Sequence, residues 1–264
     1  MKLIKRTIAL LTIFSFLFST QANSQVLLSL LFGDKLNSGK VEFGMNGGFN
    51  LSYLRGISQS KAQNNWELGF YFDILLKEES PWHLSTGVYV KSNVGGTNIP
   101  LNYGGNRVIN DSILEGFENF EGTVSKQFNT FYVPMNLRYK FENGFFIEAG
   151  AQAGLVFKTK DIYLAEVDGN DLEYTVNVGV KDNGLYKWFD GGIDGGIGYK
   201  FKKGMGMSLG VWYYLGLTNI YKNDLGYKAY NSSMYVLATI PIGKKKAERE
   251  RAEKAAAAAN SDTK

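Results

Sequence analysis

A single histidine limits how much acid–base chemistry this chain can carry. His83 is the only histidine among 264 residues, and there is no cysteine. Multi-histidine metal sites, zinc ribbons, thiol nucleophiles and disulfide scaffolds are therefore excluded. Ser85 lies two residues after His83, and Asp73 would stand opposite Ser85 if their strands form a hairpin. A His/Ser/Asp group of this kind could activate a serine for attack on a lipid.

Two further motifs imitate ligand sites without matching them. The glycine cluster 191–198 lacks the G-x-G-x-x-G spacing and lies within a strand pattern instead of opening a helix, so it does not predict a dinucleotide site. The acidic run 168–173 resembles a calcium loop, but it lacks the required glycine and the terminal glutamate spacing. We predict solvated loop charge there, and we expect no metal and no cofactor.

Between the two ends of the chain, the sequence shows period-two alternation of apolar and polar side chains. This period places successive side chains on opposite faces of a strand. The lengths of the alternating segments suit the roughly 9–11 residues that a tilted strand needs to cross a membrane. The eight alternating segments are 41–53, 66–76, 82–91, 131–141, 145–157, 189–201, 205–217 and 234–242.

The connections between these segments alternate between long and short. Outer-membrane barrels show this asymmetry, with short periplasmic turns and longer outside loops. The sequence therefore predicts an all-β fold, an eight-stranded antiparallel up-and-down transmembrane β-barrel, with both termini periplasmic. The long loops are 54–65, about 92–128, 158–187 and 218–232, and the short turns are 77–81, 142–144 and 202–204.

Short turns fix which residues stand opposite each other. Phe141 should oppose Phe145 across Glu142-Asn143-Gly144, a type I turn closed by a left-handed glycine, and Phe201 should oppose Met205 in the same way. The resulting pairs on the polar face are Arg138–Glu148, Asp194–Trp212, Asp73–Ser85 and Glu67–Lys91. The predicted ion network inside the barrel consists of Arg138, Glu148, Asp73, Asp194, Glu67 and Lys91. We interpret it as structural, and a proton or ion relay is the alternative.

The two faces of the segments indicate which one meets lipid. Full charges in mid-strand can pair inside a lumen, and aromatic residues lie toward the ends of the apolar face, as in interfacial girdles. An eight-stranded barrel is just wide enough inside for its own side chains, and glycines there would leave space for large rings, so we predict a packed lumen and no open pore. The predicted girdle residues are Trp66, Trp82, Phe141, Phe145, Tyr199 and Phe201. The rings expected inside are Tyr71, Tyr89, Tyr132, Phe146, Trp212, Tyr214 and Tyr235.

The ends of the chain have a different composition. Residues 1–24 form a signal peptide pattern with a basic start, an apolar run and small residues at the cleavage site. Residues 25–40 are expected to form a periplasmic segment, 41–243 the barrel, and 244–264 a charged, alanine-rich periplasmic tail. The signal and the tail each carry three net positive charges, which leaves −2 of the formal +4 for 25–243. The charge therefore indicates no nucleic-acid partner.

Four stretches of the sequence carry a family resemblance: LFGDKLNSGKVEFG at 31–44, FYVPMNLRYKF at 131–141, FIEAGAQAG at 146–154 and YLGLTNI at 214–220. They resemble the PorT-like family of outer-membrane β-barrel proteins over about 30–242. The resemblance implies an eight-stranded barrel without a catalytic residue, and its named member is associated with type IX protein secretion. The chain departs from the usual aromatic barrel end, because Ile242-Gly243 leads into the charged tail.

These observations predict a non-enzymatic outer-membrane protein of a Gram-negative bacterium, acting as a structural or binding component or as an accessory subunit of an envelope or secretion complex. The expected partners are outer-membrane lipid and, through the periplasmic ends or the long loops, proteins of such a complex. A lipid-modifying enzyme around His83 and a small channel are the alternatives. His83 lies next to a short turn and points into the lumen by parity, away from outer-leaflet substrate, which favours a structural role.

Overall fold

The structure is a computed structural model that describes residues 36–57, 59–100, 121–167, 170–178, 180, 185–203, 205–243, 249, 252 and 253. Its contacts divide the chain into two compact units, Gly44–Pro241 and the combined ends Met1–Phe43 and Ile242–Lys264. The predicted signal peptide lies outside the described residues, as do most of the predicted 25–40 segment and most of the tail. Among the described residues, no helix has the length and apolar character needed to span a membrane.

The described residues contain nine named β-strands. They are β1 (Val41–Arg55), β2 (Gln63–Leu75), β3 (Trp82–Pro100), β4 (Glu121–Lys140), β5 (Phe145–Val167), β6 (Asn170–Val178), β7 (Phe189–Lys200), β8 (Ser208–Asn219) and β9 (Tyr230–Pro241).

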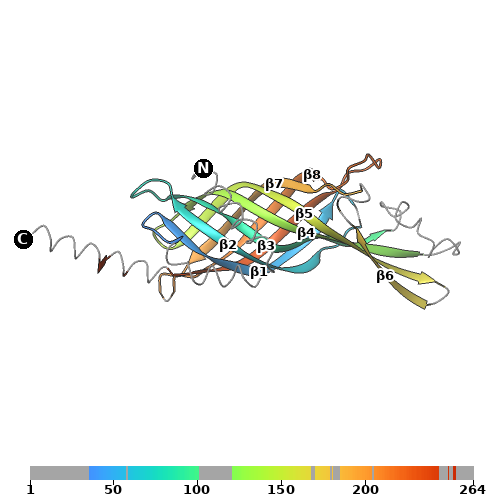
Figure 1. Cartoon of the computed structure of the whole chain (residues 1–264), viewed down its shortest axis with the longest axis horizontal. Helices are drawn as coiled ribbons and strands as arrows, with labels where there is room; N and C mark the ends of the chain where they lie inside the picture. The colour runs from blue at the N-terminus through green and yellow to red at the C-terminus, as the bar shows by residue number, and fades with distance from the viewer. Residues whose placement is uncertain are drawn as a thin grey trace, which may run out of the picture. The chain divides into compact units, whose positions relative to one another are not determined.

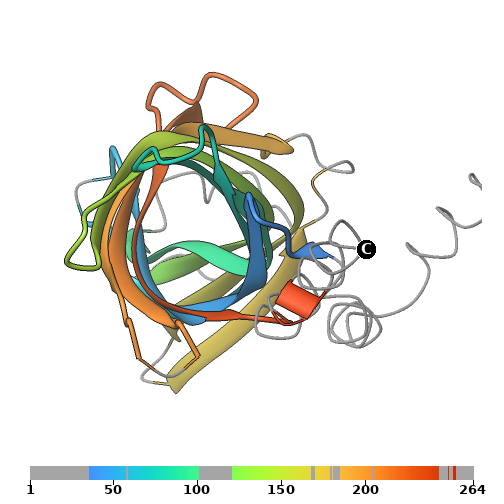
Figure 2. The ribbon, with the colours of Figure 1, turned by 90° about the vertical axis from the view of Figure 1, so that its left-hand side faces the viewer.

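Eight of these strands close into a ring. The order of neighbours is β1-β2-β3-β4-β5-β7-β8-β9, and β9 pairs back onto β1, with Gly44 opposite Pro241 and Arg55 opposite Tyr230. Every pair whose register is described is antiparallel. Viewed along the axis of the ring, the strands surround a central interior (Figure 2). The predicted eight-stranded up-and-down barrel is confirmed.

The ninth strand belongs to an extension of the sheet beyond the ring. β5 pairs with β7 only as far as Leu155, and from Thr159 to Val167 it pairs with β6 instead. β4 accompanies β5 along both parts, so these strands project together from one end of the barrel (Figure 1). The predicted loops 92–128 and 158–187 are therefore strand over much of their described length. The sequence shows no clear alternation of apolar and polar residues there, because the inward positions of this part of β4 include both charged and apolar residues.

The turn between β4 and β5 has the predicted geometry. The Phe141 amide donates to the Phe145 carbonyl at 2.9 Å, and the Gly144 amide donates back to the Phe141 carbonyl at 3.1 Å. Gly144 adopts φ = +100°, a backbone conformation that glycine reaches without a steric penalty. This turn sets the register that places Arg138 opposite Glu148.

The turn between β7 and β8 differs from the prediction. Phe201 donates its amide to the carbonyl of Met207, not Met205, and Gly206 adopts φ = +74°. The longer turn shifts the register by two residues, so Asp194 lies opposite Tyr214 and not opposite Trp212. A shift of two preserves parity, and Asp194 therefore still points into the lumen.

The pairing of β2 with β3 corrects a second expectation. Asp73 lies opposite Ser85 as predicted, and this register continues to Gly69 and Tyr89. A β-bulge then inserts one residue into β3, which places Lys91 opposite Leu68 and Ser92 opposite Glu67. A shift of one residue moves a side chain to the other face. Lys91 is therefore exposed on the outside, and the predicted Glu67–Lys91 pair does not form.

The polar face of the strands is inside and the apolar face outside. On β4 the outward apolar positions run without a break from Phe131 to Tyr139, and Phe141 follows them in the turn. At about 3.4 Å per residue and a tilt of about 45°, positions 131–141 cover about 24 Å along the barrel axis, close to the roughly 25 Å apolar band of outer-membrane barrels. All the rings predicted to point inward are buried: Tyr71, Tyr89, Tyr132, Phe146, Trp212, Tyr214 and Tyr235.

Candidate functional site

The interior of the barrel is the part of the molecule that gathers polar and charged side chains. β4 crosses its whole height, and its inward side chains show what fills each level. From the short-turn end upward they are Arg138, Asn136, Pro134, Tyr132, Thr130, Phe128, Lys126 and Val124, and all are buried. Three levels follow from this order: an ionic cluster, a layer of tyrosines, and a mainly apolar core at the long-loop end.

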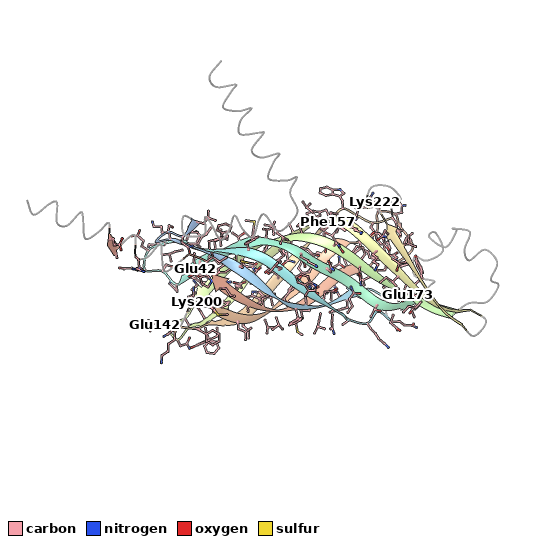
Figure 3. All side chains as sticks on the ribbon, turned by 60° about the horizontal axis from the view of Figure 1, so that its bottom comes forward. Glu42, Glu142, Phe157, Glu173, Lys200 and Lys222 are labelled. Carbon is pink, nitrogen blue, oxygen red and sulfur yellow. The ribbon has the colours of Figure 1, made fainter. Side chains whose placement is uncertain are left out.

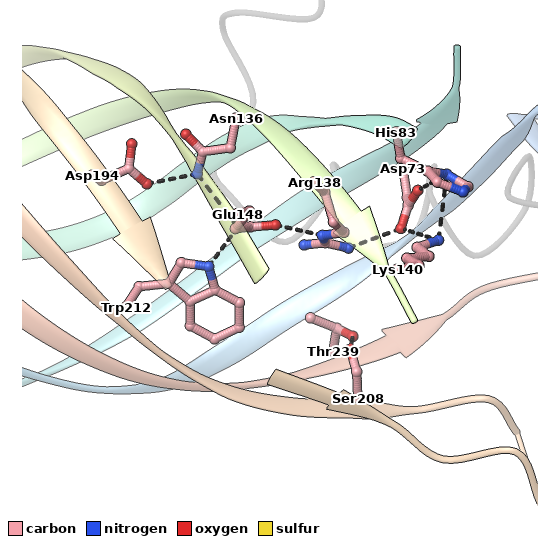
Figure 4. Close-up of polar contacts among 10 residues, drawn as sticks. All are labelled: Asp73, His83, Asn136, Arg138, Lys140, Glu148, Asp194, Ser208, Trp212 and Thr239. Carbon is pink, nitrogen blue, oxygen red and sulfur yellow. Dashed lines mark hydrogen bonds and ion pairs between the residues drawn. The ribbon is translucent and has the colours of Figure 1, made fainter. Parts of the chain in front are cut away.

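Asp73 is the centre of the ionic cluster at the short-turn end. Its Oδ1 atom lies 2.6 Å from Nδ1 of His83, and its Oδ2 atom accepts from Nη1 of Arg138 at 2.8 Å. The ammonium of Lys140 lies 2.7 Å from the same Oδ2 atom. The carboxylate, which is almost fully buried, is therefore compensated by two cations and an imidazole (Figure 4). The neighbouring strands β2, β3 and β4 supply all four side chains.

Glu148 is the second centre of the cluster. Its carboxylate accepts hydrogen bonds from Nε of Arg138 and from the indole Nε1 of Trp212, and Nδ2 of Asn136 lies 3.3 Å away (Figure 4). The same amide nitrogen of Asn136 donates to Asp194 at 2.7 Å. Arg138 links the two centres, so the cluster joins side chains from six strands: β2, β3, β4, β5, β7 and β8.

The predicted ion network is therefore found only in part. The structure brings Arg138, Glu148, Asp73 and Asp194 together, and Asp194 joins through Asn136. Glu67 is buried elsewhere, where the hydroxyl of Ser92 donates to it at 3.0 Å. Lys91 lies outside the lumen altogether, because of the bulge in β3.

A layer of tyrosines fills the middle of the barrel. The hydroxyl of Tyr132 donates to Asp190 Oδ2 at 2.5 Å, and Asn231 donates to the same oxygen at 2.9 Å. Tyr132 also contacts the ring of Tyr214, with 5.4 Å between the centroids. The rings rest on glycines: a Cβ atom added at Gly154 would overlap the Tyr132 ring. This confirms the predicted use of lumen glycines as space for rings.

Sequence reasoning missed a third group, above the tyrosines. Nζ of Lys126 lies 2.9 Å from Asp161 Oδ2 and 2.7 Å from the hydroxyl of Tyr186, which itself donates to Asp161 at 2.8 Å. Both charged side chains are 0% exposed. Burial, followed by the neighbouring Asp161 carboxylate, raises the pKa of Tyr186 well above its usual range, so its hydroxyl stays protonated. Tyr186 belongs to a cluster of buried, mainly apolar side chains, whose members at the long-loop end include Leu54, Ile57, Val94, Ile99, Val124, Phe128, Leu185 and Ile220.

The predicted girdle residues lie on the outside of the barrel. At the short-turn end they form two clusters of edge-to-face rings. Trp82 and Phe141 each contact Tyr139 at 4.9 Å between centroids, and Tyr199 contacts Phe145 at 5.0 Å and Phe201 at 5.3 Å. Trp66 lies at the other end of β2, near the long-loop end of the ring.

His83 and Asp73 form the contact that catalysis would need, but their surroundings differ from a catalytic triad. A triad leaves the carboxylate to orient the histidine, and the other imidazole nitrogen faces the nucleophile. Here Asp73 is shared with Arg138 and Lys140, and the described contacts of His83 do not include Ser85. Within the described ranges, no group of three or more acidic or histidine side chains is arranged to hold a metal ion.

A closed antiparallel barrel with its apolar face outward and its ionic groups inside is a barrel of the membrane type. Comparison with known families agrees with this class: the family described as "Outer membrane protein beta-barrel domain" matches residues 21–222. The chain belongs to this family, and its location is the outer membrane. A comparison with curated protein sequences gives no match.

Several solved structures are similar to this chain at low sequence identity and with TM-scores below 0.5. The attachment invasion locus protein Ail of Yersinia pestis has a TM-score of 0.35 and 10% identity over 77% of this chain and 99% of that chain. Neisserial surface protein A has a TM-score of 0.33 and 8% identity over 75% and 96%. OprG of Pseudomonas aeruginosa has a TM-score of 0.32 and 12% identity over 76% and 93%. At such identities the likeness concerns the fold alone.

Proposed function

We propose that this protein is a non-enzymatic component of the outer membrane that acts through its exterior and its ends. The observation that carries the proposal is the filled lumen. Every inward side chain of β4 between Arg138 and Val124 is buried, which supports a lumen that is filled along the described length of this strand. What the barrel presents to other molecules is its outer face, the projecting strands β3 to β6, and the chain ends.

In this proposal the projecting strands face the cell exterior and both termini face the periplasm. Short turns at one end and long connections at the other support that orientation, because outer-membrane barrels insert with their short turns inside. The basic tail from Lys244 onward would then meet periplasmic partners. The resemblance to PorT-like proteins makes an accessory role in an envelope or protein-secretion complex the specific form of the proposal.

The orientation can be tested with two epitope tags. A tag inserted at position 110 should be labelled by antibody on intact cells, and a tag after Lys264 should be labelled only after the outer membrane is permeabilised. Labelling of the C-terminal tag on intact cells would contradict the orientation. Heat-modifiable migration of both tagged proteins is the control for folding.

The accessory role can be tested by site-specific crosslinking. Because the chain has no cysteine, an introduced cysteine is the only thiol that can react. Arg249 and Glu253 of the tail are both exposed in the structure, so the test uses the single variants Arg249→Cys and Glu253→Cys. If the tail docks on a periplasmic subunit, both positions should give the same crosslinked product in cells. A matched cysteine at Met135, which faces lipid in mid-barrel, should give none. Equal crosslinking from all three positions, or from none, would contradict docking through the tail.

A lipid-modifying enzyme around His83 is the second candidate, and the 2.6 Å contact between His83 and Asp73 is the observation that favours it. Replacing His83 with Ala would abolish a change in membrane lipid that depends on the protein. An unchanged lipid composition in cells carrying the variant, with the barrel still heat-modifiable, would eliminate this candidate.

A further inference from the structure

Two β-bulges flank the same residue of β4, Thr130, one on each side. In β3 the extra residue lies between Tyr89 and Ser92, and Ser92 stands opposite Thr130 of β4. In β5 the extra residue is Phe157, because Thr130 stands opposite Val156 and Asn129 opposite Lys158. β4 itself keeps its alternation, so both irregularities belong to its neighbours.

Each bulge moves one lysine from the inside of the barrel to the outside. Unbroken alternation from Tyr89 would point Lys91 into the lumen, and unbroken alternation from Phe157 would do the same with Lys158. In the structure both lysines are exposed on the outer face. Bulges commonly re-aim a side chain for a purpose. Both cases here concern a cation, and both cations lie beside the same short segment of β4.

Aromatic side chains surround the two lysines on the outer face. Nζ of Lys91 lies 3.7 Å from the centre of the Trp66 ring, a cation–π contact. Phe131 stacks on Phe157 with 4.6 Å between ring centroids, and Figure 3 shows Phe157 pointing away from the barrel. We name this surface the outer strip; it consists of Trp66, Lys91, Phe131, Phe157, Lys158 and Trp188, from five adjacent strands or their ends.

The outer strip lies where the apolar surface of the barrel ends. Below Phe131 the outward residues of β4 are apolar, and above it they are Asn129, Gln127 and Ser125. Trp188 is held at this height, since its carbonyl accepts the Val156 amide at 2.7 Å, and it is 61% exposed. Lysine on the lipid face is unfavourable at the midplane of a bilayer and nearly neutral at its boundary, where headgroups begin.

We propose that the outer strip binds the phosphate groups of an anionic glycolipid headgroup in the outer leaflet. Each ammonium supplies three donors and a positive charge. Among the described residues, neither Lys91 nor Lys158 forms an ion pair with a carboxylate. The two lysines lie one strand apart and face positions two residues apart along β4, Phe131 and Asn129. Twice the strand spacing, combined with two residues of rise, places their backbones about 12 Å apart. That separation suits a sugar headgroup that carries two phosphates, and the rings beside the lysines pack against its sugars and upper acyl chains.

This inference rests on the proposed orientation, in which the long-loop end faces the outer leaflet. The test uses the full-length protein in phosphatidylcholine nanodiscs, titrated with bisphosphorylated, monophosphorylated and dephosphorylated lipid A. The wild-type protein should bind the bisphosphorylated form best and the dephosphorylated form least. Lys91→Gln and Lys158→Gln should each weaken binding of the bisphosphorylated form about five-fold, and about 25-fold together.

The matched control is the pair Lys77→Gln and Lys202→Gln, two exposed lysines of the short turns, which should leave the affinity unchanged. Lys91→Arg with Lys158→Arg should retain binding, because the charge stays in place. Equal binding of all three lipids by the wild-type protein would overturn the proposal without any variant. Competition by millimolar inorganic phosphate as strong as by lipid would also overturn it, in favour of a free-anion site. The epitope tags report the orientation separately, so its failure would be distinguishable from a failure of lipid binding.

Discussion

Lys126 and Asp161 show how a charged residue is accommodated in the interior at the long-loop end. They stand opposite each other on β4 and β5, and Tyr186 bridges them, donating to the carboxylate and accepting from the ammonium. A buried pair of this kind contributes little net stability compared with apolar residues of similar size, but an unpaired member is very unfavourable. The group therefore acts as a constraint: both partners must be present together or absent together.

Replacing Lys126 with Met should destabilise the barrel by about 3–5 kcal/mol, because Asp161 is left as a buried, uncompensated charge. Adding Asp161→Leu to that variant should restore most of the stability. The midpoint of urea-induced unfolding, followed by heat-modifiable migration, measures both changes. If the double variant were as unstable as the single one, the pair would be contributing favourable energy of its own.

Gly154 illustrates a second residue-scale requirement, since a Cβ atom there would overlap the Tyr132 ring. Gly154→Ala should destabilise the barrel by about 1–3 kcal/mol through overpacking of the tyrosine layer. The neighbouring Ala153 points outward, so Ala153→Val should have little effect and serves as the matched control. The same unfolding assay compares them, and equal effects would mean that the lumen has room at this level.

At the scale of elements, the positions and facing of the strands could be predicted from the sequence, because period-two alternation reports directly which side of a strand is buried. The register between strands, in contrast, could not be predicted from the sequence. The choice between Gly204 and Gly206 as the turn glycine moves the β7–β8 register by two residues, and both fit the composition of a turn. The bulge in β3 left a weak signal, since Lys91 and Ser92 are consecutive polar residues after an alternating run.

Hidden alternation also explains why the extension of β3, β4 and β5 was predicted as loop. In this extension the buried pair Lys126–Asp161 takes inward positions that apolar residues would otherwise fill. The hydrophobic pattern is therefore interrupted although the backbone pairing continues. The candidate site was predictable only where a short turn fixed it, as for Arg138 and Glu148. Lys126 and Asp161 meet only because both strands are longer than their apolar patterns.

The height of the membrane on β4 can be tested with single-cysteine spin labels. Labels at Val133, Met135 and Leu137 should be reached by oxygen, which dissolves in lipid, because these residues face outward within the apolar band. Labels at Asn129 and Gln127 should instead be reached by a water-soluble nickel chelate. Oxygen accessibility that continued through Gln127 would move the boundary of the membrane above the outer strip and remove the geometric basis for headgroup binding.

At the scale of the whole barrel, the described interior is filled at three levels, with the tyrosine layer between two end closures. The ionic cluster closes the short-turn end, where Arg138 and Trp212 meet on Glu148, and the apolar core closes the long-loop end around Phe128 and Tyr186. A solute would have to pass all three levels, so the wild-type protein should show no single-channel conductance in planar bilayers. Any one filled level should be enough to keep the barrel closed.

Variants that remove the filled levels separately and together test whether each level can keep the barrel closed. Arg138→Ala with Trp212→Ala should remain non-conducting, because the apolar core still fills the upper interior. Phe128→Ala with Tyr186→Ala should also remain closed, although it is expected to lose several kcal/mol of stability. Only a variant that combines all four with Tyr132→Ala and Tyr214→Ala, which empty the tyrosine layer, should give discrete conductance steps. Ile147→Ala on the lipid face should change nothing. Conductance from either pair alone would mean that the remaining two levels do not seal the barrel, and a channel function would then regain support over a role exercised at the outer surface.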